Sequence, residues 1–167
     1  MRCPNGLSEC WREINIDTIL HQAGAIAYRV LDDKIQVLLI TSRDSGRWII
    51  PKGNIDPGST PSKAAEREAY EEAGVKGRLG ASLPLGFYTY FKRSTSGALC
   101  PATVEVYLLR VNEQLKKWPE KRERQLSWAS IEDAIRIIEE PGVVPLLRRL
   151  MELQVSLVSQ KEPSLAG

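Results

Sequence analysis

The sequence predicts a single domain of the α/β (α+β) class, in which helices pack on a central mixed β-sheet. Apolar, β-branched runs alternate along the chain with segments that have the helical period. The first two runs are separated only by the residues LDD, which indicates an antiparallel hairpin and therefore a sheet that is not purely parallel. The 167 residues suffice for one domain with a substantial core. We expect it to span residues 18–155, between an N-terminal arm at 1–17 and a flexible C-terminal tail at 156–167.

Strands are expected where β-branched and aromatic residues form short apolar runs. The hairpin comprises residues 18–30 and 34–42, and RWIIP predicts a short strand at 47–51 that Pro51 ends. Three later strands are expected at 83–93, 103–111 and 125–129, with the segment STSGALCPA as a turn between the first two.

Helix signals occur at three places. Residues 61–73 are preceded by Ser59 or Thr60 as an N-cap and followed by Gly74 as a stop. The segment SIEDAIRIIEE, at 130–140, opens with Ser130 as an N-cap and has apolar residues at helical spacing. A last helix is expected from about Val143 to residue 157.

Composition restricts the partners and the compartment. The formal net charge of +2 is too small to favour a nucleic acid polymer or a membrane, so we expect neither. Three cysteines without a close pair, beside the single histidine His21, argue against a structural zinc site and for a reducing compartment. The first residues lack the apolar stretch of a signal peptide, and no run approaches membrane-spanning length. We therefore expect a cytoplasmic protein that is a monomer or a homodimer.

The helix expected at 61–73 concentrates carboxylates, namely Glu66, Glu68, Glu71 and Glu72. Like charges four residues apart destabilise an isolated helix, so the cluster needs a reason. Glu68 and Glu72 share one face beside two alanines, which would let the helix approach the sheet and hold both carboxylates at the edge of a packed surface. Such a pair is costly unless a cation neutralises it, and oxygen ligands favour Mg²⁺ or Mn²⁺. The alternative is an ordinary solvated helix face.

The loop before this helix has the composition of a phosphate-binding loop. Gly53 and Gly58 permit backbone conformations that other residues resist. Lys52 adds a positive charge, and Arg43 and Arg47 lie just upstream. A cation, bound phosphates and a spare carboxylate together indicate metal-assisted hydrolysis of a phosphoanhydride.

Residues 53–75, GNIDPGSTPSKAAEREAYEEAGV, resemble the signature of the Nudix hydrolases, Gly-x5-Glu-x7-Arg-Glu-U-x-Glu-Glu-x-Gly-U, where U is bulky and apolar. The positions that match in register are Gly53, Arg67, Glu68, Glu71, Glu72, Gly74 and Val75. The resemblance implies a Nudix-type α/β/α sandwich with a central mixed β-sheet and a pyrophosphohydrolase that uses Mg²⁺ or Mn²⁺.

The resemblance also implies roles for individual residues. Glu68 and Glu72 would bind the metal ion, helped by the backbone carbonyl of Gly53. Glu71 is the leading candidate for the base that activates water, although members of the family differ in this assignment. Arg67 would be structural and would orient the carboxylates.

The pattern breaks at Ser59, where the signature has its first glutamate. In the family that glutamate usually pairs with the arginine that corresponds to Arg67. We therefore expect Asp56 or Glu66 to replace part of the missing charge. A Ser59→Glu variant is expected to gain thermal stability with little change in rate.

Similarity to the diphosphoinositol polyphosphate phosphohydrolase and diadenosine polyphosphate hydrolase branches extends from about residue 23 to 140. It implies phosphate contacts from three places in the chain, in addition to Arg47 and Lys52: Ser42 and Arg43, Lys92 and Arg93, and Arg124. Arginine suits this role because it grips phosphate bidentately. A residue of this kind taken alone is more often a solvated surface charge, and only several that converge on one cleft would suit a substrate with many phosphates.

The most specific substrate prediction is a dinucleoside polyphosphate, with inositol pyrophosphates as a close competitor. The inositol-specific members carry a basic cluster where this chain has Leu20, His21 and Gln22, and tend to have glycine at Lys52. Candidates for stacking on a base are Tyr88, Tyr90 and Phe91, although at least two of them could instead pack in the core. A MutT-type nucleoside triphosphate pyrophosphohydrolase and a catalytically silent nucleotide-binding module are also compatible with the sequence. Retention of all three glutamates of the signature favours catalysis.

Overall fold

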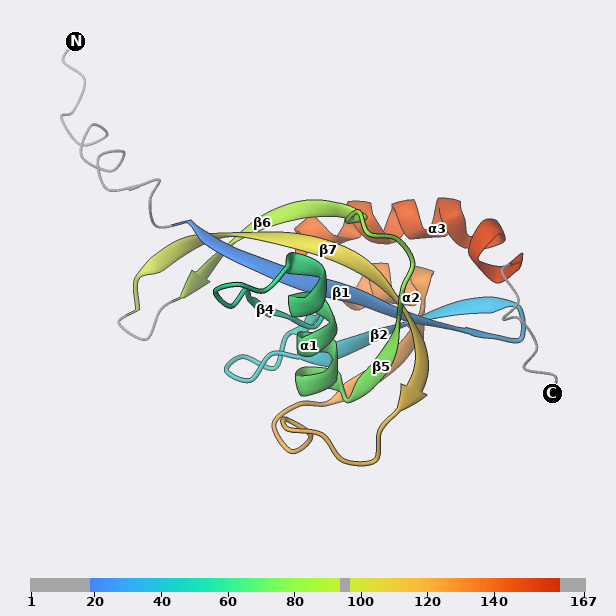
Figure 1. The fold of residues 1–167 in the computed structure, drawn as a ribbon, viewed down its shortest axis with the longest axis horizontal. Coiled ribbons are helices and arrows are strands. Elements are labelled where there is room, and N and C mark those ends of the chain that lie inside the picture. Colours follow the sequence, from blue (N-terminus) through green and yellow to red (C-terminus); the bar gives the residue numbers. More distant parts are fainter. Residues whose placement is uncertain (1–18, 94–96, 160–167) are drawn as a thin grey trace, which may run out of the picture.

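The structure, a computed structural model, describes residues 19–93 and 97–159 (Figure 1). The arm expected at 1–17, part of the expected turn at 94–96 and the end of the expected tail at 160–167 lie outside the described residues. No helix in the described part of the chain is long and apolar enough to cross a membrane.

Within the described residues, eight strands form one mixed sheet in the order β3-β2-β1-β7-β5, with β4 on β1, β6 on β7 and β8 on β2. Strand β1 runs parallel to β7 and antiparallel to β2 and β4, which confirms the expected mixed sheet. The strands are β1 (Leu20–Leu31), β2 (Lys34–Thr41), β3 (Trp48–Ile49), β4 (Lys52–Asn54), β5 (Val75–Leu79), β6 (Gly86–Arg93), β7 (Leu99–Gln114) and β8 (Leu126–Ser130).

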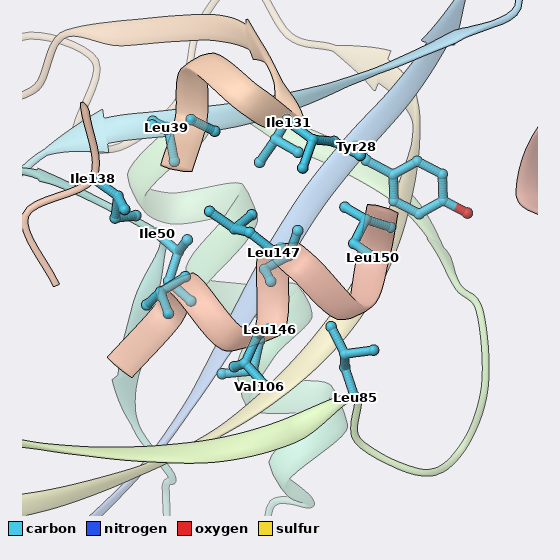
Figure 2. Close-up of a cluster of buried hydrophobic side chains, with 14 of the residues drawn as sticks. Tyr28, Leu39, Ile50, Leu85, Val106, Ile131, Ile138, Leu146, Leu147 and Leu150 are labelled. Atoms are coloured by element: carbon cyan, nitrogen blue, oxygen red, sulfur yellow. The ribbon is translucent and has the colours of Figure 1, made fainter. Parts of the chain in front are cut away.

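Helices cover both faces of the sheet, so the expected α/β/α sandwich is confirmed. They are α1 (Pro61–Ala73), α2 (Ile131–Ile137) and α3 (Val144–Ser159), with a short 3-10 helix, η2 (Pro141–Val143), before α3. Four buried alanines of α1 pack on alanines of β1, whereas buried residues of α2 and α3 join a second cluster on the opposite face. Figure 2 shows this second cluster, with Leu146, Leu147 and Leu150 of α3 pointing toward the sheet. Because alanine side chains are short, α1 lies close to β1 and brings its glutamates to the sheet.

The ends of α1 form as the sequence predicts. Thr60, rather than Ser59, is the N-cap, and its hydroxyl accepts a hydrogen bond from the Lys63 amide. Gly74 ends the helix in the left-handed region at φ 65°, which favours glycine. A Cβ at Gly74 would lie 2.3 Å from the Trp118 ring, so the position also requires the absence of a side chain.

Several strand boundaries differ from the expected ones. The strand expected at 47–51 is shortened to β3, because the chain leaves β2 there and crosses to β1. The Ala25 amide of β1 donates to the Pro51 carbonyl at 3.0 Å, and β4 then pairs with β1. Strand β5 was not predicted, because it follows the helix stop directly and contains a bulge at Gly77. Strand β7 begins at Leu99, inside the expected turn.

Proline is accommodated near the start of β7 because Pro101 lies one residue before the first β1 pair, Leu20 with Ala102. In the C-terminal part, α2 ends at Ile137 instead of residue 140, since Ile138 is extended. Helix α3 begins close to the expected residue 143 and continues to Ser159.

Candidate functional site

Helix α1 presents its glutamates in two different environments. Glu68 and Glu72 are buried, with 9% and 6% of their surface exposed, on the face that packs against the sheet. Glu71 is half-buried and Glu66 is exposed. The shared face of Glu68 and Glu72 is the one that the helical spacing predicts.

Strand β4 lies directly against the first of these carboxylates. A Cβ at Gly53 would come within 2.2 Å of the Glu68 carboxyl group, so only glycine allows this approach. Gly53 pairs with Ala23 of β1, which holds the strand in place. The Gly53 backbone and the Glu68 carboxylate therefore form one small cradle.

Arg67 braces this cradle from the exposed side. Its guanidinium donates to the Asn54 carbonyl and to Glu68 Oε1, both at 2.7 Å, and lies 3.9 Å from Glu71 Oε2. It also forms an ion pair with Asp56. Of the two residues expected to replace the missing charge at position 59, Asp56 contacts Arg67.

The turn around Ser59 explains how Asp56 reaches Arg67. The Ser59 amide donates to the Asp56 carbonyl at 2.9 Å, and the Ser59 hydroxyl donates to the Thr60 carbonyl at 3.3 Å. This turn closes the loop just before α1. A carboxylate at position 59 would belong to the same turn as Asp56.

A double-mutant cycle tests this compensation. We expect Asp56→Asn to lower the free energy of unfolding by about 0.2–1 kcal/mol, because Asp56 is mostly exposed and its ion pair is screened. Adding Ser59→Glu to that variant should recover most of the loss, whereas Ser59→Glu alone should add less stability. Urea denaturation of the four proteins measures the coupling. Strictly additive effects would show that the two positions do not share Arg67.

Glu72 is held by one backbone and one side-chain donor. Its Oε2 accepts a hydrogen bond from the Lys52 amide at 2.9 Å, and its Oε1 pairs with the Arg124 guanidinium. Burial raises the pKa of Glu72 to about 7, against the opposing effect of Arg124. Burial likewise raises the pKa of Glu68, against the opposing effect of Arg67. Each buried carboxylate thus has a cationic neighbour that offsets part of its desolvation cost.

The loop between β2 and β3 carries three of the residues that were expected to bind phosphate. The Ser42 amide donates to the Arg47 carbonyl at 2.8 Å, and the Arg47 amide donates to Ser42 Oγ at 3.1 Å, so the loop is tightly closed. Both arginine side chains reach solvent, and Arg43 lies 3.5 Å from Glu120 and Glu123. These guanidinium groups are accessible to a ligand.

Lys52 and Arg124, in contrast, are buried and already paired. The Lys52 ammonium lies 2.7 Å from Glu140 Oε1, and the side chain is 7% exposed. Arg124, whose side chain is 4% exposed, contacts Glu72 and donates to Glu120 at 2.7 Å. Their positions indicate support for the carboxylates more than direct contact with a substrate.

The remaining expected residues lie on β6. Lys92 and Arg93 are exposed at its end, and Arg93 donates to the Gly97 carbonyl at 2.9 Å. Tyr88 is buried in the core, whereas Phe91 is 65% exposed. A hollow of about 270 Å³ has an uncharged lining that includes Phe91, Tyr90, Pro101 and Thr103.

Two acidic residues near the site were not predicted from the sequence. The Glu120 amide donates to the Glu71 carbonyl at 3.0 Å, which places Glu120 beside the glutamate helix and within reach of Arg124 and Arg43. Glu140 is buried between Lys52 and Tyr88. Neither residue belongs to a local sequence pattern. Their place in the site follows only from contacts with residues that are distant in the sequence.

The donors fit a hard divalent cation held in part by its substrate. Among the described residues, no three side chains of the His, Cys, Asp or Glu type are grouped so as to hold a metal ion. The two buried carboxylates, Glu68 and Glu72, nevertheless offer oxygen donors, and β4 at Gly53 lies directly against the first of them. Mg²⁺ is usually bound in this way, through one or two carboxylates together with waters and substrate phosphates.

Comparisons with known proteins agree with this geometry. The model of the NUDIX domain family matches residues 20–153. The chain is 32% identical over 163 residues to "Nudix hydrolase 13, mitochondrial" of Arabidopsis thaliana, covering 86% of this chain and 79% of that protein. It is 34% identical over 133 residues to diphosphoinositol polyphosphate phosphohydrolase 2 of Rattus norvegicus, covering 77% and 69%. A solved structure of a C. elegans Ap4A hydrolase binary complex is similar at a TM-score of 0.62 with 27% identity, covering 83% of this chain and 99% of that one.

Proposed function

Because this chain belongs to the Nudix family and is a pyrophosphohydrolase, we propose that it hydrolyses a phosphoanhydride bond of a dinucleoside polyphosphate with the help of Mg²⁺ or Mn²⁺. The observation that supports metal dependence is the pair of buried carboxylates, Glu68 and Glu72, against the cradle at Gly53. Arg67 and Arg124 offset part of the cost of burying this pair, and a divalent cation would supply the further positive charge.

The side chains of the site divide the work of the reaction. Glu68, Glu72 and the Gly53 carbonyl would hold the cation, which when bound neutralises charge on the phosphate oxygens and lowers the pKa of water. Glu71 is the more accessible glutamate, with 41% of its side chain exposed. In the proposed mechanism Glu71 accepts a proton from the attacking water, a new bond forms to phosphorus and the bond to the leaving phosphate breaks. Arg67 keeps Glu68 oriented.

Recognition of the phosphates is assigned to the exposed basic residues. Arg43 and Arg47 extend from the closed loop that Ser42 begins, and Lys92 and Arg93 lie at the end of β6. Arginine and lysine at such positions can pair with several phosphates of one substrate. We reassign the Lys52 and Arg124 side chains from phosphate binding to structural roles, because both are buried and paired, Lys52 with Glu140 and Arg124 with Glu72.

Two substrate classes compete for this site. The uncharged hollow beside Phe91 favours a ligand with a flat, uncharged part such as a nucleobase. The burial of Lys52 weakens the argument that its charge selects nucleotides, and the relative named a diphosphoinositol polyphosphate phosphohydrolase supports inositol pyrophosphates. We retain the dinucleoside polyphosphate as the first candidate because the basic residues at the site are few.

A substrate panel with Mg²⁺ tests the proposal. Diadenosine tetraphosphate, an inositol pyrophosphate and ATP are compared by kcat/KM, and we expect the dinucleotide to give the highest value. The control is Glu71→Gln, which removes the proposed base and should lower every rate. A higher kcat/KM for the inositol pyrophosphate would make it the preferred substrate, and the proposed hydrolysis of a phosphoanhydride bond would still hold. If the wild-type protein released no phosphate from any compound and equalled Glu71→Gln, the protein would be a binding module.

The compartment and the assembly belong to the same proposal. A cytoplasmic location is supported by the three cysteines without a disulfide framework. The relative from Arabidopsis is named as mitochondrial, which makes that organelle the competing location. We propose a monomer or a homodimer that acts on a small molecule.

A further inference from the structure

The ammonium group of Lys52 is buried against the carboxylate of Glu140. Its Nζ lies 2.7 Å from Glu140 Oε1, and the two side chains are only 7% and 6% exposed. The backbone amide of the same residue donates to Glu72 Oε2 at 2.9 Å. Lys52 therefore connects Glu140, which the proposed mechanism does not use, with a carboxylate that the mechanism requires.

Glu140 is itself anchored to the core by a hydrogen bond. Its Oε2 accepts a hydrogen bond from the Tyr88 hydroxyl at 2.9 Å. Gly142, two residues later, lies so close to the Tyr88 ring that a Cβ would come within 2.8 Å of it. The second oxygen of Glu140 is thereby directed at the Lys52 ammonium.

A buried ammonium group requires an anion beside it. Glu72 is the other carboxylate beside Lys52, because it accepts a hydrogen bond from the Lys52 amide. Burial raises the pKa of Glu72, and the Lys52 charge is among the groups that oppose this rise. Without a carboxylate at position 140, Glu72 would be the anion left for the ammonium. A Glu72 that is neutralised by lysine would bind a divalent cation poorly, because the two positive charges would compete for it.

We propose that Glu140 is a positioning residue that pairs with the Lys52 ammonium and so leaves the Glu72 carboxylate available to a divalent cation. The inference rests on the proposed function, in which Glu72 is a metal ligand. If Glu140 has this role, the segment that connects α2 and η2 influences the affinity of the site for the metal ion.

The test is Mn²⁺ binding, followed by the electron paramagnetic resonance signal of free Mn²⁺ and therefore independent of turnover. We expect Glu140→Gln to weaken Mn²⁺ binding by about 10- to 100-fold, the range seen when groups behind a metal ligand are changed. The double variant Lys52→Met/Glu140→Gln removes the competing ammonium and should bind Mn²⁺ nearly as well as the wild type. A merely structural role for the ion pair would not produce this rescue.

The matched control is Glu139→Gln, because Glu139 belongs to the same segment and accepts a hydrogen bond from the Trp48 amide at 2.9 Å but does not contact Lys52. It should leave Mn²⁺ affinity unchanged. The inference about Glu140 would be wrong if Glu140→Gln bound Mn²⁺ as tightly as the wild type, or if the double variant bound it as weakly as Glu140→Gln. Either result would leave the proposed function in place. Loss of the native circular dichroism spectrum in Glu140→Gln would also make the inference wrong, since it would show that Lys52 finds no second partner. A wild-type protein that binds no more Mn²⁺ than Glu72→Gln would overturn the proposed function as well.

Discussion

Replacing Glu72 with glutamine is expected to reduce kcat by about 100- to 1,000-fold. The loss follows because a bound cation contributes several kcal/mol of charge stabilisation, and each 1.36 kcal/mol changes a rate tenfold. Glutamine keeps the size of the side chain and an oxygen that can accept from the Lys52 amide, so the local packing is retained. What it removes is the negative charge that would hold the cation.

The thermal stability of Glu72→Gln shows whether its loss of activity comes from the lost metal ligand or from a disturbed fold. Because burial raises the pKa of Glu72 to about 7, its ionised form is costly in the metal-free protein. The neutral glutamine avoids this cost, and Arg124 keeps its ion pair with Glu120 and its hydrogen bond to the Thr41 carbonyl. We therefore expect the variant to melt at a temperature close to that of the wild type. Its activity should also require more Mg²⁺ to reach half of its maximum.

Glu66→Gln is the matched control for Glu72→Gln, since Glu66 lies on the same helix and is exposed. It should leave kcat unchanged. Initial rates measured over a Mg²⁺ series for the three proteins provide the comparison. Equal rates and equal Mg²⁺ requirements in Glu72→Gln and the wild type would remove Glu72 from the metal site.

The parts of this fold that the sequence predicts well are those with local causes. The β1–β2 hairpin follows from LDD, whose two aspartates take the left-handed region at φ 49° and 56°. Helix α1 follows from its caps and its small apolar face. The burial of Glu68 and Glu72 follows from the same spacing, because two alanines share their side of the helix.

Other parts of the site depend on contacts that no local pattern contains. The sequence predicts Lys52 as a phosphate-binding cation in a loop. In the structure it forms a buried ion pair with Glu140, which is 88 positions away. Arg124 was expected to bind phosphate. Its side chain is instead buried, where it pairs with Glu72 and donates a hydrogen bond to the Thr41 carbonyl. The choice of Asp56 over Glu66 as partner for Arg67 likewise required the geometry of the loop.

The second large effect is expected from Arg124→Met in metal-free buffer. The substitution should lower the free energy of unfolding by about 3–5 kcal/mol at pH 8, because breaking a buried ion pair leaves the other charge without compensation. The charge left behind is that of Glu72, whose side chain is 8% exposed. Equilibrium unfolding in urea at fixed pH measures the difference.

The pH dependence identifies Glu72 as the cause. Its folded-state pKa of about 7 lies above the ordinary value of 4.5, so its contribution to stability is present below pH 4.5 and is lost as the pH rises through 7. Arg124 opposes this rise in pKa, and without it the pKa of Glu72 should move higher still. The variant should therefore lose stability more steeply than the wild type above pH 7. At pH 5 Glu72 is protonated in both proteins, and the difference between them should shrink.

Arg43→Met is the control, because Arg43 also approaches Glu120, at 3.5 Å, but has 57% of its side chain exposed. An exposed pair contributes only about 0–1 kcal/mol, so this variant should lose little stability at either pH. If Arg124→Met were equally destabilising at pH 5 and pH 8, the loss would come from packing and from the Thr41 contact instead of from Glu72. A difference confined to high pH would instead show that Arg124 supplies, in the metal-free protein, the positive charge that the buried carboxylate needs. The divalent cation of the proposed mechanism would then share that carboxylate with an arginine that is already in place.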